Sequence, residues 1–107
     1  MRIVSLNGDI AWRIITAYIN EVGSFKSVTG IVYQATVSGE CIMYKGGNRN
    51  GGKYENIERA EFISVFPVIQ NMDVVNTSSI KRSIPSSLYR KRTPLIGLLI
   101  SSGLLDD

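Results

Sequence analysis

The stretch "SVTGIVYQATVSGECIMYK", residues 27–45, decides the fold of this 107-residue chain. Its first part, residues 27–37, is rich in β-branched and aromatic side chains, which is typical of a half-buried strand. One face of this strand would carry Ile31, Tyr33, Ala35 and Val37. Ser38 and Gly39 supply a turn, and "ECIMYK" at residues 40–45 is predicted to be the returning strand. The pattern therefore predicts an antiparallel hairpin with one apolar face.

An amphipathic helix is predicted before this hairpin, at residues 9–23. Its apolar side chains recur at the three- and four-residue spacing of a helix face. They are Ile10, Ile14, Ile15, Tyr18, Ile19 and Val22. Asp9 is suited to cap the N-terminus and Gly23 to end the helix. "RIVSL" at residues 2–6 adds a short strand that ends before Asn7.

After the hairpin the sequence predicts a polar loop and a second helix. "GGNRNGGK" at residues 46–53 is glycine-rich and polar, so we expect an exposed loop. Asn56 is placed to cap a helix that starts at Ile57. Pro67 lacks a backbone donor, so the helix should kink or end there. The apolar side of this helix would consist of Phe62, Ile63, Phe66 and Ile69.

The last third of the chain is predicted to be helical. Thr93 is suited to cap the final helix, with Pro94 at its first position and Gly103 as its stop. The three short helical pieces would span residues 77–84, 85–92 and 94–102. The sequence thus predicts a single small α+β domain over residues 1–107, with an N-terminal helix, a small antiparallel sheet built on the hairpin, and a helical C-terminal third.

Composition sets the broad class of protein. Hydrophobic residues make up 44% of the chain and charged residues 20%, as in an ordinary globular domain. The single Cys41 lies in an apolar run, so we expect a small buried filler and a cytoplasmic setting. The longest apolar run, residues 95–100, is far shorter than the roughly 20 residues of a membrane span. No signal-peptide core follows Met1, so we expect no membrane partner.

Charge is distributed unevenly along the chain. The 12 basic and 9 acidic residues give a net charge of +3. Basic and acidic residues balance in residues 1–73, whereas residues 74–105 hold basic groups and no acid. A run of cations without acids favours an anionic partner, although such runs are often only a solvated face.

Residues 77–105, "TSSIKRSIPSSLYRKRTPLIGLLISSGLL", resemble the second and third helices of winged-helix and other helix-turn-helix DNA-binding domains. The resemblance implies that Ile80 and Ile84 face the core and that Leu95 and Leu99 pack the recognition helix against it. It implies that hydroxyl and cationic side chains contact phosphates. The residues expected to bind nucleic acid are Lys81, Arg82, Ser86, Ser87, Arg90, Lys91 and Arg92, supported by Arg49 and Lys53 from the polar loop.

The inventory of reactive groups argues against an enzyme. The chain contains no His, and Cys41 has no imidazole to activate it. Residues 47–53 satisfy G-x-x-x-x-G-K, but Tyr54 stands where a phosphate-binding loop needs a magnesium-binding hydroxyl. Three glutamates at a spacing of three, Glu55, Glu58 and Glu61, are better explained as the first turns of a helix than as a metal site. We therefore expect no catalytic residue, no metal and no small-molecule cofactor.

Two functional hypotheses follow from the sequence. The first is a non-enzymatic nucleic-acid-binding protein, a small regulator that acts as a homodimer and takes DNA in preference to RNA. The second is a protein-interaction module or homo-oligomer in which "PLIGLLI", residues 94–100, binds another chain and the basic residues form a solvated rim.

Overall fold

The structure is a computed structural model that describes residues 2–3, 6–46, 49–72, 75, 80, 84, 88 and 90–106, with the backbone alone at residues 2, 3, 49, 50 and 106. Its elements are β1 (Arg2–Ile3), α1 (Gly8–Val22), β2 (Ser24–Lys26), β3 (Val32–Ser38), β4 (Cys41–Lys45), the 3₁₀ turn η1 (Arg49–Gly52), β5 (Glu55–Glu58), α2 (Arg59–Gln70), α5 (Arg92–Ser101) and β6 (Leu105–Asp106).

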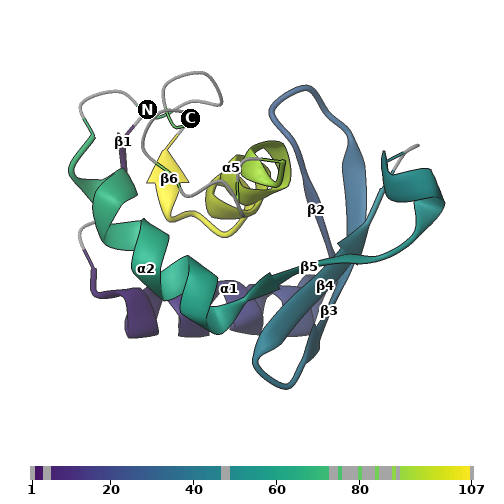
Figure 1. The fold of residues 1–107 in the computed structure, drawn as a ribbon, viewed down its shortest axis with the longest axis horizontal. Coiled ribbons are helices and arrows are strands. Elements are labelled where there is room, and N and C mark those ends of the chain that lie inside the picture. The colour runs from purple at the N-terminus through teal and green to yellow at the C-terminus, as the bar shows by residue number, and fades with distance from the viewer. Residues whose placement is uncertain are drawn as a thin grey trace.

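Four strands form one antiparallel sheet in the order β2-β3-β4-β5. β1 and β6 pair separately, which brings the two ends of the chain together (Figure 1). Figure 1 shows α5 between α2 and the sheet, with α1 along the bottom of the view. The three helices thus lie toward one side of the sheet, as a sheet with one apolar face requires. The prediction of a single small α+β domain is confirmed.

The core lies between the sheet and the helices. Phe25 stacks on Tyr33 with ring centroids 5.0 Å apart, and Tyr44 meets both rings edge-on. From the helices, Trp12 of α1 packs against Phe62 of α2 at 5.6 Å. All five rings are buried. Aromatic side chains bury much area each, so this cluster supplies a large share of the hydrophobic stabilisation.

The predicted hairpin is confirmed as β3 and β4, but its first strand is shorter than expected. Residues 27–31 form a turn, and β2 precedes it as an additional strand. Ile31 is accordingly 44% exposed, whereas Tyr33 is buried as predicted. Valine, threonine and isoleucine in the turn gave the same composition signal as a strand, and composition does not mark where pairing stops.

The predicted first helix is confirmed as α1, although its cap differs. Asn7, not Asp9, is the N-cap, and its side-chain oxygen accepts a hydrogen bond from Ile10 N at 2.8 Å. Asp9 lies in the first turn, where its carboxylate contacts Arg59. Gly23 ends the helix as predicted, with φ 76°. Both Asn and Asp favour N-caps, so local propensity did not separate them.

The second helix begins later than the sequence predicts. Residues 55–58 are strand β5, and Ile57 is buried opposite Ile42 of β4. Glu58 is the N-cap of α2, and Glu61 accepts a hydrogen bond from Glu58 N at 3.1 Å. The predicted helix start at Ile57 is therefore wrong, because cross-strand pairing outweighs the cap signal of Asn56. The helix also continues past Pro67 to Gln70.

The free edge of β2 is covered by α5. A Cβ atom at Gly97 would lie only 2.6 Å from Lys26 O, so the helix backbone sits directly on the strand. One turn later Ser101 Oγ accepts from Lys26 N at 3.2 Å and donates to Lys26 O at 3.4 Å. Gly97 permits the close approach and Ser101 satisfies the outward-facing backbone groups of the edge strand.

The last helix differs from its prediction at its N-terminus. Lys91 is the N-cap, so Thr93 lies inside the helix and Pro94 is the third helical residue. Gly103 follows the helix with φ 84°, and Leu104 N donates to Leu99 O at 3.0 Å, as predicted for a glycine stop. The pieces expected at 77–84 and 85–92 fall mostly outside the described residues. Within them, Ile80, Ile84 and Leu88 are buried.

Candidate functional site

The basic turn, defined as Arg90, Lys91 and Arg92, leads directly into α5. Arg90 is exposed, and Lys91 and Arg92 are partly exposed. Lys91 N donates to Leu88 O and Leu95 N donates to Lys91 O, both at 2.9 Å. Leu88 and Leu95 are fully buried. The three cations are therefore held at a fixed point, because residues on both sides of them are anchored in the core.

Lys91 is paired with a carboxylate from α2. Its Nζ lies 3.6 Å from Glu61 Oε1, and the two side chains are only 19% and 18% exposed. Glu61 thus accepts a hydrogen bond from Glu58 N at the start of α2 and also forms an ion pair with Lys91 at the start of α5. Arg90 and Arg92 also interact with other residues. The pairing of Lys91 reduces the positive charge that the basic turn presents to a ligand.

The predicted binding residues are only partly brought together. Arg90 and Lys91 lie in a turn and only Arg92 belongs to α5, so the three cations do not share one helix as the predicted helical piece at residues 85–92 requires. Lys53 is exposed on the glycine-rich loop. Arg49 begins η1, where only its backbone is described. Four predicted residues lie outside the described residues: Lys81, Arg82, Ser86 and Ser87.

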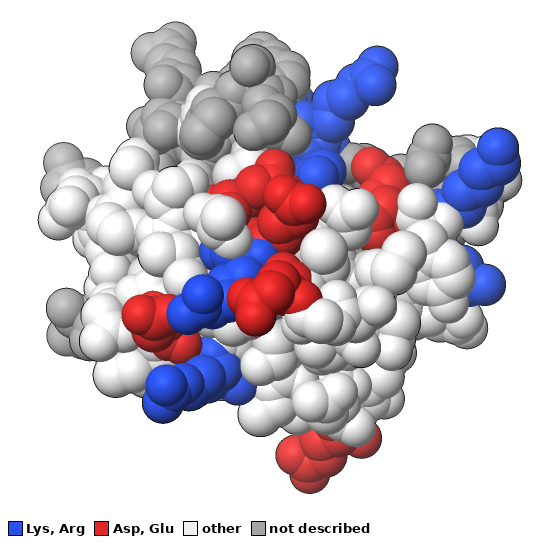
Figure 2. Space-filling model, turned by 60° about the horizontal axis from the view of Figure 1, so that its bottom comes forward, with Lys and Arg blue, Asp and Glu red and all other residues white. Residues whose placement is uncertain are grey.

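The surface charge is mixed on the face that Figure 2 shows. Acidic and basic side chains lie next to one another near the centre of this face. The ion pairs of the described residues include those of Arg59 with Asp9 and with Glu40, the latter at 3.7 Å. Such alternation weakens the long-range field that a single cluster of cations would produce.

A hollow lies on the outer face of the sheet, which points away from the helices. Side chains of alternate strand residues project to this face. They include Lys26, Val32, Gln34, Thr36, Met43, Lys45 and Asn56. The hollow has a volume of about 440 Å³ and is lined by Val32, Gln34, Lys45, Gly46 and Gly52. Beside it, Lys45 Nζ lies 4.9 Å from the ring centroid of Tyr54, which is 45% exposed.

Gly46 is needed at one wall of this hollow. A Cβ atom there would lie 2.6 Å from Val32 O and 2.7 Å from Tyr33 Cδ1. The backbone at the end of β4 therefore approaches β3 more closely than any other residue would allow. η1 follows, and its Gly51 and Gly52 have φ values of 63° and 81°, which favour glycine. The structure thus explains three of the glycines in this polar loop, Gly46, Gly51 and Gly52.

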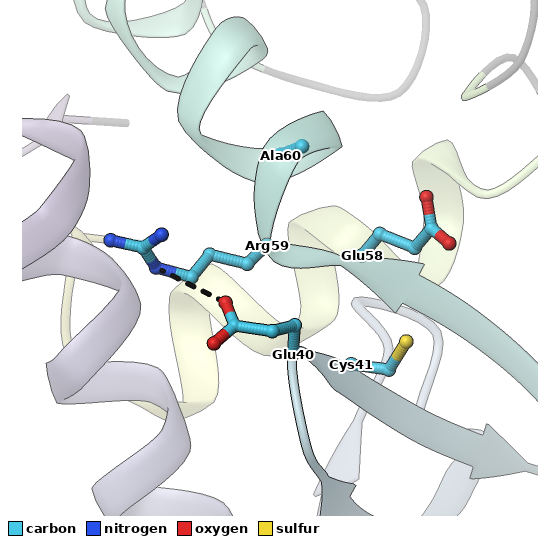
Figure 3. Close-up of a pocket in the computed structure, with 5 residues that line it drawn as sticks. All are labelled: Glu40, Cys41, Glu58, Arg59 and Ala60. Atoms are coloured by element: carbon cyan, nitrogen blue, oxygen red, sulfur yellow. Dashed lines mark ion pairs between the residues drawn. The ribbon is translucent and has the colours of Figure 1, made fainter.

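A second hollow, of about 320 Å³, lies where the β3–β4 turn meets the start of α2 (Figure 3). It is lined by Glu40, Cys41, Glu58, Arg59 and Ala60. Figure 3 shows Arg59 extending toward α1 with Glu40 turned to it, while Cys41 and Glu58 lie on the other side. Cys41 is half-buried beside this hollow, so the expectation of a buried filler is wrong. Its strand alternates inward and outward, and Ile42 takes the inward position.

Sequence reasoning missed the outer face because it placed residues 55–58 in a helix. The available signal was the alternation of polar Asn56 and Glu58 around apolar Ile57, which is typical of a strand. The three glutamates expected in the first turns of a helix are likewise divided between β5 and α2. Among the described residues, no group of three or more His, Cys, Asp or Glu is placed to hold a metal ion.

The fold is that of a small α+β protein. In comparisons with known proteins, no family model, no curated protein and no solved structure matches this chain. None of the helices in the described part of the chain is long and apolar enough to cross a membrane.

Proposed function

We propose that the protein is a non-enzymatic nucleic-acid-binding protein that uses its basic C-terminal surface and acts in the cytoplasm. The observation that carries this proposal is the basic turn. Its three consecutive cations lie at the start of α5, and most of the following residues of α5 are buried. A rigid point of attachment lowers the entropy lost when the side chains meet phosphates. Lys53, exposed on the glycine-rich loop, adds a further cation.

The type of contact follows from the residues. The guanidinium group of arginine can donate two parallel hydrogen bonds to the oxygens of one phosphate. Such contacts position a protein on DNA but do not read its sequence. Lys81 and Arg82, with Ser86 and Ser87, would extend the surface. For the basic turn we propose duplex DNA in preference to RNA, because the contacts expected there are to phosphates, whereas RNA is recognised chiefly through unpaired bases.

The test is the salt dependence of duplex binding. About five phosphate contacts predict a log–log slope of affinity against salt near −4 to −5. The double variant Arg90→Ala/Arg92→Ala should lower the magnitude of the slope by about two, because two phosphate contacts are lost. Fluorescence anisotropy of a labelled duplex at several salt concentrations measures both quantities.

The matched control is Arg13→Ala, which removes an exposed arginine from α1. Its slope should equal that of the unmodified protein. A flat salt response, or an equal loss of slope in the control and the double variant, would overturn the proposal. Thermal unfolding of each variant establishes that the fold is retained, because Arg90 and Arg92 also interact with other residues.

A second candidate function is a homo-oligomer or protein-interaction module. The surface expected for it is wrong, because Leu95, Ile96, Leu98 and Leu99 of α5 are all buried within the chain. The observation that favours this function is instead on α1, where Ile10 is 42% and Ile14 is 36% exposed. These residues are four positions apart and therefore lie on the same side of the helix.

A further inference from the structure

We infer that the outer face of the sheet binds single-stranded nucleic acid, with an unpaired base against Tyr54 and its phosphates near Lys45 and Lys53. This inference rests on the proposed function and assigns it a second surface. The surface is separate in the chain from the basic turn, since it is built from β3, β4, η1 and the segment that leads into β5.

The first support is the position of the aromatic ring. Tyr54 is 45% exposed at the side of the hollow, an exposure unlike that of Phe25, Tyr33 and Tyr44, which are at most 2% exposed. Lys45 Nζ lies 4.9 Å from the ring centroid, and this cation–π contact favours the observed position of the ring. Stacking of a base on an exposed aromatic ring is the usual means of holding a single strand.

The second support is the shape and lining of the hollow. At about 440 Å³ it falls within the size range of small-ligand sites, and so suits a single nucleotide. Val32 gives it an apolar wall, and Gln34 an amide that donates and accepts hydrogen bonds. Gly46 and Gly52 bring the backbone to its surface without side chains. The exposed lining of the hollow is more polar than apolar, which suits the polar edges of a base, so the ring of Tyr54 is the surface expected to stack on its flat face.

The third support is charge complementarity. Lys26 and Lys45 project from the outer face, and Lys53 is exposed two residues before β5 begins. On this face the described acid is Glu58, which pairs with Cys41 at the opposite end of β4 from Lys45. A strand that crosses the sheet at the Lys45 end therefore meets cations at several phosphates.

Unpaired rather than duplex nucleic acid fits this geometry. In a duplex each base is already stacked between its neighbours, so an exposed ring on an open sheet has no base face to contact. A single strand offers that face without the energy needed to unstack a duplex.

The test uses a labelled oligothymidylate of about 12 nucleotides and a duplex of the same length. We expect Tyr54→Ala to weaken single-strand binding about 5- to 150-fold, the effect of losing one stacked base. Tyr54→Phe keeps the ring and should bind nearly as well as the unmodified protein. Lys45→Gln should lower the magnitude of the single-strand salt slope by about 0.7, the value of one phosphate contact.

The Arg90→Ala/Arg92→Ala variant separates this inference from the proposed function. It should lose duplex affinity and keep most single-strand affinity. The inference is overturned if the unmodified protein does not bind the oligothymidylate, if Tyr54→Phe is as damaging as Tyr54→Ala, or if only the arginine variant loses single-strand binding. Equal competition by polyglutamate would also overturn it, because the face would then bind any acidic chain. None of these outcomes removes duplex binding by the basic turn.

Discussion

At the scale of single residues, Gly97 shows how one side chain decides the position of a helix. A glycine in a helix interior normally costs about 1 kcal/mol relative to alanine, so helix propensity alone favours its replacement. Here the helix backbone meets β2, and an added methyl group would lie 2.6 Å from Lys26 O and 2.9 Å from Ser27 Cα. Both neighbours are backbone atoms, which yield less readily than a flexible side chain.

Gly97→Ala is therefore expected to destabilise the protein by about 1–3 kcal/mol, because α5 must move away from the strand. Urea unfolding followed by the fluorescence of Trp12, which is buried against Phe62, measures the change. Ser102→Ala, near the end of the same helix, is the matched control and should cost less. A gain of stability on Gly97→Ala would contradict the close approach.

At the scale of elements, strand β5 and helix α2 meet at Glu58, and Glu61 holds this junction. Its Oε1 atom accepts from Glu58 N at 3.1 Å and lies 3.6 Å from Lys91 Nζ. The start of α2 is thus tied to the start of α5 by one side chain that is only 18% exposed. A hydrogen bond that involves a charged group contributes more than a neutral one.

Glu61→Ala should lower the free energy of unfolding by about 1–3 kcal/mol, because Glu58 N and Lys91 lose their shared partner. Glu61→Gln keeps an oxygen acceptor for Glu58 N and should cost less than the alanine variant. Denaturant unfolding of the two variants under identical conditions gives the comparison. If glutamine proves as costly as alanine, the hydrogen bond to Glu58 does not contribute and the ion pair alone matters.

The elements differ in how far the sequence determines them. α1 was predictable because its apolar spacing extends over four turns and Gly23 ends it. β5 was not, because four residues carry little periodicity and the preference of Ile57 for a strand depends on Ile42, fifteen positions earlier. The same error hid the outer face, since Tyr54 and Lys45 become neighbours only when β5 pairs with β4. Long-range pairing is what single-sequence patterns do not contain.

At the scale of the whole molecule, the arrangement of charge differs from its arrangement along the chain. Along the sequence, residues 74–105 hold no acid, whereas basic and acidic residues balance in residues 1–73. In the fold, however, Glu61 from residues 1–73 pairs with Lys91 from the acid-free part. Folding therefore brings at least one acid, Glu61, beside part of the basic run. Charge counted along a chain predicts a surface field only where the fold keeps the same residues together.

The exposed apolar residues of α1 give a prediction on assembly. If α1 joins two copies, light scattering should give twice the chain mass, and Ile10→Lys/Ile14→Lys should reduce it to one, because charges in the contact oppose burial. The matched control is Val68→Lys on α2, which is 39% exposed and should leave the mass unchanged. A single-chain mass for the unmodified protein would remove the dimer.

The cover that α5 places over β2 has a consequence for the protein outside its native state. Two polar groups of Lys26 face outward from the strand and are held by one hydroxyl, that of Ser101. When heat or mild denaturant loosens the last helix, that strand becomes free to pair with the same strand of another molecule. Partial unfolding at high concentration would then lead to aggregation through intermolecular β-sheet. The packing of α5 on β2 would therefore determine how fast the concentrated protein aggregates during storage.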